Sequence, residues 1–435
     1  MPQAGKPDYK ETLQYIFEHL PMFQRIGAAA FRKDLTNIKA LAEVLDNPHQ
    51  RFPSIHIAGT NGKGSVSYML AAILQAHGLK TGLYISPHYK DFRERIRIDG
   101  RYISKRRVVD FIERMKPAIE TIKPSFFEIS VAMAFEYFAE KQVDVAVIET
   151  GMGGRLDSTN VITPVLSVIT NISYDHMQWL GNTLEAIAGE KAGIIKPGIP
   201  VVIGETHPET KPVFVKHAAE KQSVIVFADD HYRVAFKAAN FTHTRFSVEK
   251  DGNTLPDYEV NLHGNYQAAN LGTVLQATEL LATSGFLNIQ DKLIRDGLYQ
   301  LKPLTGFMGR WQLLGQSPKI IADSAHNEAG LRSAFAQLDG LSYRHLHIVT
   351  GFVNDKDIER VLPLFPRQAR YYFAKANIPR GLDAKILQRM AADCQLKGRA
   401  YSSVKNALLA AKRCAAPEDL ILVIGSVFVV AEVLP

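Results

Sequence analysis

Apolar and polar residues are arranged along the 435-residue chain in blocks that predict helices and strands in turn. Residues 8–46 carry apolar positions such as Leu13, Ile16 and Leu20 at helical spacings of three and four. After them, short and nearly all-apolar runs such as VDVAVIE and VLSVIT are separated by helical segments such as VSYMLAAILQAHG and FFEISVAMAFEYFAEKQ. Apolar strands that alternate with helices predict a parallel sheet covered on both faces.

Residues 228–262 alternate more and contain turn residues, which predicts an antiparallel, hairpin-like section. A helix follows and closes on Gly285. After the stretch KPLTGFMGR the alternation restarts, with KIIADSA, HLHIVTG, RYYFAKA and DLILVIG as strands. We therefore predict an α/β protein of two domains: a P-loop-type ATPase domain with a mostly parallel sheet in residues 1–305, and a smaller Rossmann-like domain in residues 306–435.

The composition is that of a soluble globular protein, with 46% hydrophobic and 22% charged residues. The formal charge is +7, but lysine and arginine are spread along the chain, which argues against a nucleic-acid groove and fits an anionic substrate. Cys394 and Cys414 have no metal-binding spacing. No apolar run reaches the ~20 residues that span a bilayer, and the N-terminus lacks an apolar signal core. We expect a cytoplasmic protein that binds no membrane.

A glycine-rich turn between a predicted strand and helix is the strongest local feature: Gly59, Thr60, Asn61, Gly62, Lys63, Gly64 and Ser65. Glycines let backbone N–H groups point at phosphate oxygens, the helix adds its positive end, and Lys63 adds a charge. The strict P-loop pattern fails, because a glycine separates Lys63 from Ser65 and Ile57 stands at the upstream glycine position. We predict a nucleotide site; a glycine-rich turn without ligand is the alternative.

Three further strand ends carry polar side chains: Ser86 after TGLYI, Glu149 at the end of VDVAVIE, and Asp175-His176 after VLSVITNIS. Parallel sheets place ligand groups at the carboxyl ends of their strands. Carboxylate and hydroxyl oxygens suit a hard cation such as magnesium, whereas a histidine is unusual for it. From the residues alone, a hydrogen-bonded structural role remains the alternative for His176.

The chain resembles the folylpolyglutamate synthetases, including bacterial forms that are also dihydrofolate synthetases, within the Mur-ligase superfamily. The matching segments are HIAGTNGKGS, YISPH, FRERI, FFEIS, ETGMGGRLDSTN, SYDHMQWLGNTLEAIAGEKAGIIKPGIP, MGRWQ, DSAHN and GSVFVVAE. The resemblance implies ATP-dependent ligation of L-glutamate to dihydropteroate or folate through an acyl phosphate. About 55 residues precede the phosphate loop, too few for the uridine-nucleotide domain of the Mur ligases proper, which favours the folate branch.

The resemblance also implies roles for individual residues. Magnesium, at two sites, would be held by Ser86, Glu149, His176 and Lys191, the last as a carbamate; Lys63, Lys191 and His176 would be catalytic. Besides the phosphate loop, ATP would contact Asn270, Arg310 and Asp323. The alternatives are a solvated helix lysine for Lys191 and a turn or helix-capping role for Asp323.

The same resemblance implies that Phe126, Phe127, Glu128, Leu156, Asp157 and Ser158 border the pteridine, and that Arg95, His326 and Ser426 bind the incoming glutamate. Core packing is the alternative for the two phenylalanines. The sequence departs from the family where Asp34 and Asn37 stand at positions usually held by glycine and arginine. It departs again at Ser324, where glycine is common. The first departure puts the pterin contacts of that segment in doubt.

Two other functions remain open at this point. A Mur-type ligase would add an amino acid to a peptidoglycan precursor and would turn over with a uridine-nucleotide substrate. A nucleotide-binding switch would bind ATP without turnover that depends on an acceptor, although metal-ligand candidates at separate strand ends disfavour it. No coiled-coil heptads are visible, and family members are commonly monomers, so we expect a monomer.

Overall fold

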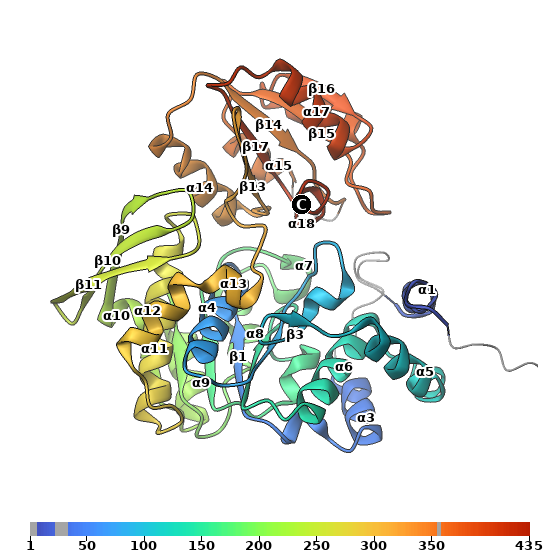
Figure 1. Cartoon of the computed structure of the whole chain (residues 1–435), viewed down its shortest axis with the longest axis vertical. Coiled ribbons are helices and arrows are strands. Elements are labelled where there is room, and N and C mark those ends of the chain that lie inside the picture. The colour runs from blue at the N-terminus through green and yellow to red at the C-terminus, as the bar shows by residue number, and fades with distance from the viewer. Residues whose placement is uncertain (1–6, 22–33, 355–357) are drawn as a thin grey trace, which may run out of the picture. The chain divides into compact units, whose positions relative to one another are not determined.

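The computed structural model describes residues 7–21, 34–354 and 358–435. Residues 22–33, part of the stretch predicted to be helical, lie outside the described residues. The chain forms two compact units, each assembled from separate stretches of sequence (Figure 1). The first unit contains Met1–Ile172, His176–Tyr232 and Asn270–Thr305, and the second contains Ser173–Asp175, Arg233–Ala269 and Gly306–Pro435.

The first unit is built on a sheet with the strand order β4-β3-β2-β5-β1-β6-β7-β8. In the series β2-β5-β1-β6-β7-β8 each strand is parallel to its neighbours. Most residues of these strands are buried, as a sheet with two covered faces requires. The strands are β1 (Ser54–Ala58), β2 (Thr81–Tyr84), β3 (Ile96–Ile98), β4 (Arg101–Tyr102), β5 (Val145–Glu149), β6 (Leu166–Ile169), β7 (Val201–Ile203) and β8 (Ile225–Phe227).

One edge of this sheet is antiparallel, because β3 pairs with β2 and β4 pairs with β3 in that direction. The apolar pattern does not predict these two strands, which are only 3 and 2 residues long. They are joined by Asp99 and Gly100, with φ angles of 48° and 71°, both in the left-handed region that a tight two-residue hairpin requires. The Asp-Gly pair is therefore the sequence signal for this edge.

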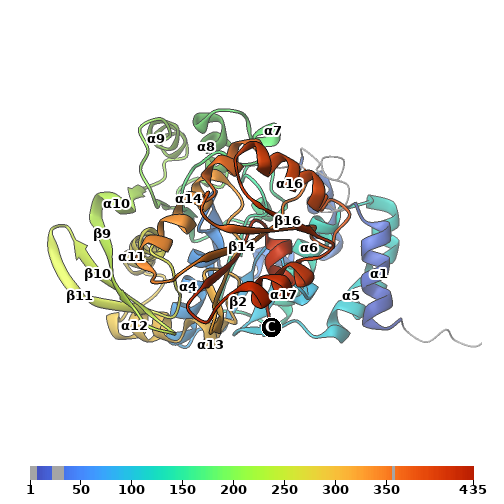
Figure 2. The same cartoon turned by 90° about the horizontal axis from the view of Figure 1, so that it is seen from above.

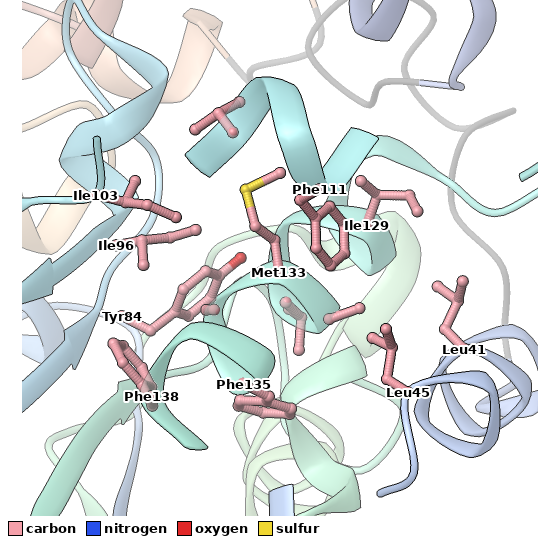
Figure 3. Close-up of a cluster of buried hydrophobic side chains, with 14 of the residues drawn as sticks. Leu41, Leu45, Tyr84, Ile96, Ile103, Phe111, Ile129, Met133, Phe135 and Phe138 are labelled. Carbon is pink, nitrogen blue, oxygen red and sulfur yellow. The ribbon is translucent and has the colours of Figure 1, made fainter. Parts of the chain in front are cut away.

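Among the described residues, two clusters of buried apolar side chains pack helices on the sheet. The larger cluster joins α1, α3, α5 and α6 to β2 and β5, with Tyr84, Phe111, Met133 and Phe135 among its members (Figure 3). The other joins α8 and α9 to β1, β6 and β7. The described helices of this unit include α1 (Tyr9–His19), α3 (Thr36–Val44), α4 (Lys63–Ala76), α5 (Lys105–Ile122), α6 (Phe126–Glu140), α7 (Met177–Leu180), α8 (Leu184–Ala192), α9 (Lys211–Glu220), α10 (Ala228–His231), most of α11 (Gln267–Thr283), α12 (Asp291–Tyr299) and α13 (Leu301–Thr305).

The predicted antiparallel section is confirmed as a three-stranded sheet, with β10 between β9 and β11 (Figure 2). These strands are β9 (Tyr232–Ala239), β10 (Thr244–Lys250) and β11 (Asn253–Val260). Helix α11 (Gln267–Thr283) follows, and Gly285, with φ of 73°, stands just beyond its end, as the sequence predicts.

The second unit also holds a sheet with the order β12-β13-β17-β14-β15-β16, parallel except for the edge strand β12. Its apolar cluster includes Phe352, Tyr371 and Leu422. The elements are β12 (Gln312–Gln316), β13 (Lys319–Asp323), β14 (Leu346–Thr350), β15 (Arg370–Ala374), β16 (Gly398–Tyr401), β17 (Leu420–Ile424), α14 (Glu328–Ala336), α15 (Ile358–Val361), α16 (Ala384–Asp393), α17 (Val404–Cys414) and α18 (Val427–Ala431).

The predicted fold class, two α/β parts with mostly parallel sheets, is confirmed. Among the described helices, none combines the length and apolar character needed to cross a membrane.

Candidate active site

The glycine-rich turn lies between the end of β1 and the start of α4, on a central strand of the sheet. Gly59 and Gly62 have φ angles of 145° and 85°, which residues with a side chain rarely adopt. Space also requires glycine, because a Cβ at Gly59 would lie 1.9 Å from Thr170 Oγ1 and one at Gly62 would lie 2.2 Å from Asn270 Oδ1. Asn270, one of the predicted ATP contacts, therefore lies directly against the turn.

Residues after the neighbouring strand β6 hold the turn in place. The Thr60 N–H donates to the Asn171 carbonyl at 2.9 Å, and the Asn61 N–H donates to the Asn171 side chain at 3.0 Å. The Thr170 hydroxyl donates to the Asn61 carbonyl at 2.5 Å. Thr170 and Asn171 are not among the residues predicted from the sequence, although both follow the end of β6, a position equivalent to those of Ser86 and Glu149.

Lys63 is the first residue of α4, and its ammonium is folded back onto the turn. Its Nζ donates to the carbonyl oxygens of Gly59 at 2.9 Å and Thr60 at 3.2 Å. The lysine charge thus lies at the helix N-terminus, where the helix dipole also favours an anion.

Ser86 and Glu149, predicted from separate strand ends, are brought together. The Ser86 N–H donates to Glu149 Oε2 at 3.2 Å, and Glu149 is only 4% exposed. A Cβ at Gly64 would lie 3.9 Å from Glu149 Oε1, so this carboxylate faces the first turn of α4. Strands β2, β5 and β1 are parallel neighbours, which places their carboxyl ends at one edge of the sheet.

Lys191, on α8, also reaches the turn. Its Nζ donates to the Gly59 carbonyl at 2.7 Å, and the residue is 3% exposed, so the structure excludes the solvated lysine alternative. Gly154 brings this helix close, because a Cβ there would lie 2.9 Å from the carbonyl oxygens of Glu190 and Lys191. Close packing of the glycine-rich 151–154 segment on α8 thus positions the Lys191 amine.

His176 precedes α7 as its capping residue, with a left-handed φ of 51°. It follows β6, the strand next to β1 in the sheet. Its role as a metal ligand stays a prediction. In the described part of the chain, no group of three or more His, Cys, Asp or Glu side chains has the arrangement of a metal site. One buried carboxylate beside a phosphate loop nevertheless fits magnesium, which is usually held by one or two carboxylates, waters and substrate phosphates.

Phe126 and Phe127, at the start of α6, are packed differently. Phe126 is buried against Phe92, with ring centroids 5.7 Å apart, and the Arg95 guanidinium lies 5.1 Å from its ring centroid. Phe127 is half-buried and covers Gly151, where a Cβ would lie 2.6 Å from the ring. The structure therefore supports core packing for Phe126 and leaves part of Phe127 exposed.

Asp157 is saturated by its own loop. Its two oxygens accept from the backbone of Gly151 at 2.8 Å and Met152 at 2.9 Å, and from Thr159 through both its backbone at 3.0 Å and its hydroxyl at 2.6 Å. Burial raises the pKa of the Asp157 carboxyl, and these hydrogen bonds oppose that shift. Asp157 thus shapes the loop on which its half-buried neighbours Leu156 and Ser158 lie.

Glu128 caps the N-terminus of α6. It forms a capping box with Ser125, whose N–H donates to Glu128 Oε2 at 2.6 Å. The same oxygen accepts from the Asn37 side chain at 3.3 Å. Asn37, which stands where the family usually has arginine, therefore contacts a residue predicted to border the pteridine.

In the second unit, Asp323 ends β13 and accepts three hydrogen bonds. The donors are the Tyr266 hydroxyl at 2.9 Å, the Trp311 N–H at 2.8 Å and the Ala325 N–H at 2.8 Å. The hydrogen bond from the Ala325 N–H shows that Asp323 stabilises a turn, which is the alternative role of this residue. Arg310, directly before Trp311, is half-buried.

The predicted glutamate-binding residues divide between the units, with Arg95 in the first and His326 and Ser426 in the second. His326 Nδ1 lies 2.9 Å from the Ser324 carbonyl, and its Nε2 lies 3.7 Å from Asp175 Oδ2. Ser426 is the N-cap of α18 and accepts from the Val429 N–H at 3.2 Å. Both follow neighbouring parallel strands, β13 and β17.

Comparison with known families agrees with this geometry. Residues 57–278 match the Mur ligase middle domain, and residues 309–427 match the Mur ligase, glutamate ligase domain. The chain belongs to the Mur ligase family. Members of this family are ATP-dependent ligases, and the phosphate loop, Glu149 and Lys191 all lie within the matched middle domain.

Within the Mur ligase family, the chain is similar to folylpolyglutamate synthases. It is 33% identical to the folylpolyglutamate synthase of Lacticaseibacillus casei, over 98% of each chain. It is 35% identical to a probable bifunctional folylpolyglutamate synthase/dihydropteroate synthase of Haloferax volcanii, of which it spans 50%. The structure of E. coli FolC in complex with DHPP and ADP matches with a TM-score of 0.85 at 29% identity, covering 100% of this chain and 98% of that one. The resemblance drawn from the sequence motifs is confirmed.

Proposed function

We propose that this Mur ligase family member joins L-glutamate to dihydropteroate, to folate polyglutamates, or to both, with ATP as the energy source. One observation carries the proposal: Lys63, Lys191 and the Glu149 carboxylate converge on the glycine-rich turn from α4, α8 and β5. A lysine ammonium and oxygen ligands for magnesium around a helix N-terminus are the groups that phosphoryl transfer requires.

The reaction proceeds in two steps. A carboxylate oxygen of the acceptor attacks the γ-phosphorus of ATP, the bond to the β–γ bridging oxygen breaks, and ADP leaves. The glutamate amine then attacks the carbonyl carbon of the acyl phosphate, loses a proton and expels phosphate, which leaves an amide. Negative charge develops in both steps, and in this proposal Lys63 and the N–H groups at the start of α4 stabilise it.

The proposed metal residues are Ser86, Glu149, His176 and Lys191, the last after its amine has taken up carbon dioxide as a carbamate. Magnesium, proposed at two sites, would neutralise phosphate charge when bound. The proximity of Ser86 and Glu149 to each other and to the first turn of α4 supports this assignment.

We assign ATP and pterin binding to residues 1–305 and glutamate ligation to residues 306–435. Asn270, Arg310 and Asp323 complete the ATP site in this proposal. Phe126, Phe127, Glu128, Leu156, Asp157 and Ser158 border the pteridine, with Phe126 and Asp157 acting through the shape of the pocket wall. Arg95, His326 and Ser426 bind the incoming glutamate. We further propose a cytoplasmic monomer that uses only small-molecule substrates.

An ADP-release assay tests the proposal by comparing dihydropteroate, tetrahydrofolate and a uridine-linked peptide precursor, each with glutamate and magnesium. We expect ADP release that needs one of the two pterins, glutamate and magnesium together. Turnover with the uridine-linked precursor alone would instead identify a ligase of peptidoglycan synthesis. ATP binding without acceptor-dependent turnover would identify a nucleotide switch.

A further inference from the structure

Arg95 has an unusual environment for an arginine. It ends the short helical turn Phe92–Arg95, is 3% exposed, and lies with its guanidinium 5.1 Å from the ring centroid of Phe126. Its Nε donates a hydrogen bond to His88 Nδ1 at 2.8 Å. Its Nη1 is buried and has no hydrogen-bond partner among the described residues. A buried donor without a partner is costly, and a ligand oxygen would remove that cost.

The two contacts restrain different motions of the guanidinium. The Phe126 ring restricts the position of the guanidinium plane, as in other arginine–aromatic pairs. The His88 bond at Nε restricts rotation within that plane. The Tyr84 hydroxyl also interacts with the guanidinium, and the three contacts together fix the direction in which Nη1 points.

The segment between His88 and Arg95 is held in one conformation by hydrogen bonds to Glu94. Buried Glu94 accepts the backbone N–H groups of Tyr89 at 2.7 Å, Lys90 at 2.8 Å and Asp91 at 2.8 Å. These bonds tie the residue next to Arg95 to the residues that follow His88. The distance between the imidazole and the guanidinium is therefore set before any ligand binds.

His88 can accept this bond only as a neutral imidazole with its proton on Nε2. The 2.8 Å hydrogen bond from Arg95 Nε therefore assigns the acceptor role to Nδ1 in this structure.

We propose that His88 is a positioning residue, which holds Arg95 so that its unpartnered buried Nη1 is directed at a carboxylate oxygen of the incoming glutamate. The inference rests on the proposed function, in which Arg95 binds glutamate. A purely structural His88 is the competing explanation, because its ring also packs near Phe92 and Phe126, with centroids 6.3 and 6.4 Å away.

Three substitutions of His88 separate the two explanations. H88N keeps an oxygen acceptor close to the position of Nδ1, H88Q moves the acceptor toward the position of Nε2, and H88F keeps a ring without any acceptor. We expect H88F and H88Q to raise the KM for glutamate roughly tenfold, the effect of losing one hydrogen bond to a charged group. The kcat and the KM for ATP should change less than about threefold, and H88N should remain close to wild type.

The control is H49F, which changes another half-buried histidine of the same unit that packs beside Phe135. Thermal unfolding of each variant reports whether it folds. Equal KM values for glutamate in H88N, H88Q and wild type would overturn the proposal, and that comparison decides the matter if H88F fails to fold.

A crystal structure of H88Q supplies a readout that needs no turnover. We expect the Arg95 guanidinium to rotate away from its wild-type orientation, and an unchanged orientation would overturn the proposal. A wild-type enzyme that does not turn over with glutamate would refute the proposed function instead, so the two failures are distinguishable.

Discussion

The Lys191 amine donates a 2.7 Å hydrogen bond to the carbonyl oxygen of Gly59, the first residue of the phosphate loop. This contact brings α8 to the edge of the sheet where Glu149 and Ser86 also meet. A buried lysine at this point is close enough to the loop to act on bound phosphates, either as an ammonium or, after reaction with carbon dioxide, as an oxygen donor.

We predict that Lys191 is a carbamate in the active enzyme. Native mass spectrometry of wild type should show an added carbon dioxide that is missing in K191A, and activity should fall in buffer depleted of carbon dioxide and return with bicarbonate. An unmodified lysine in an enzyme shown to contain bound metal would contradict the prediction.

Lys63→Ala is expected to lower kcat by a factor of about 10² or more, because the ammonium beside Gly59 and Thr60 no longer stabilises charge on the transferred phosphoryl group. Steady-state ADP release measures the effect, and thermal unfolding shows whether the variant is folded. Activity near that of wild type would mean that the phosphate site is misplaced.

Gly62→Ala should abolish most of the ATP-dependent turnover, because the new Cβ would meet Asn270 Oδ1 and the φ of 85° would be strained. Gly78→Ala is a matched control, since Gly78 has a similar φ of 80° but no atom within 4 Å of the added Cβ. The control should lose stability by only ~1–2 kcal/mol and keep its activity. Equal loss of activity in both variants would show that strain, rather than the Asn270 contact, dominates.

Arg95→Ala is expected to raise the KM for glutamate much more than the KM for ATP, because it removes the buried cation that we place beside the incoming amino acid. Measuring both constants by ADP release checks this. Equal increases in the two constants would assign Arg95 to another role.

Stability at low pH should depend on Asp91. Burial acts to raise the pKa of this carboxyl, but hydrogen bonds from Arg93 and Tyr9 outweigh it and hold the pKa at about 2, below its usual value of about 4. Because the folded-state pKa is depressed, the stabilisation is complete above a pH of about 4 and is lost as the pH falls towards 2. Urea unfolding should therefore show that wild type and D91N differ most near neutral pH and converge in acid. A constant difference would contradict the assignment.

Site residues that lie at the carboxyl ends of strands can be predicted from the sequence, as Ser86, Glu149 and the phosphate loop show. A parallel sheet gathers its carboxyl ends whatever the side chains are. Thr170 and Asn171 obey the same rule, yet ordinary polar residues after a strand carry no distinguishing chemistry. Long-range contacts cannot be inferred in this way, because the bond between Asn37 and Glu128 depends on the packing of α3 against α6.

The roles of Glu128 and Asp157 illustrate a different limit. The capping box of Ser125 and Glu128 is readable from its spacing. The four donors that saturate Asp157 come from a loop whose path is not apparent in the sequence. A carboxylate in a family motif can therefore be occupied entirely by donors from its own loop.

The chain passes from the first compact unit to the second and back more than once, at Tyr232–Arg233, Ala269–Asn270 and Thr305–Gly306 among other points. During synthesis, strands β9 to β11 therefore leave the ribosome well before residues 306–435, to which they belong in the folded protein. For the same reason, a protease cut between Thr305 and Gly306 would split the second unit rather than release it whole.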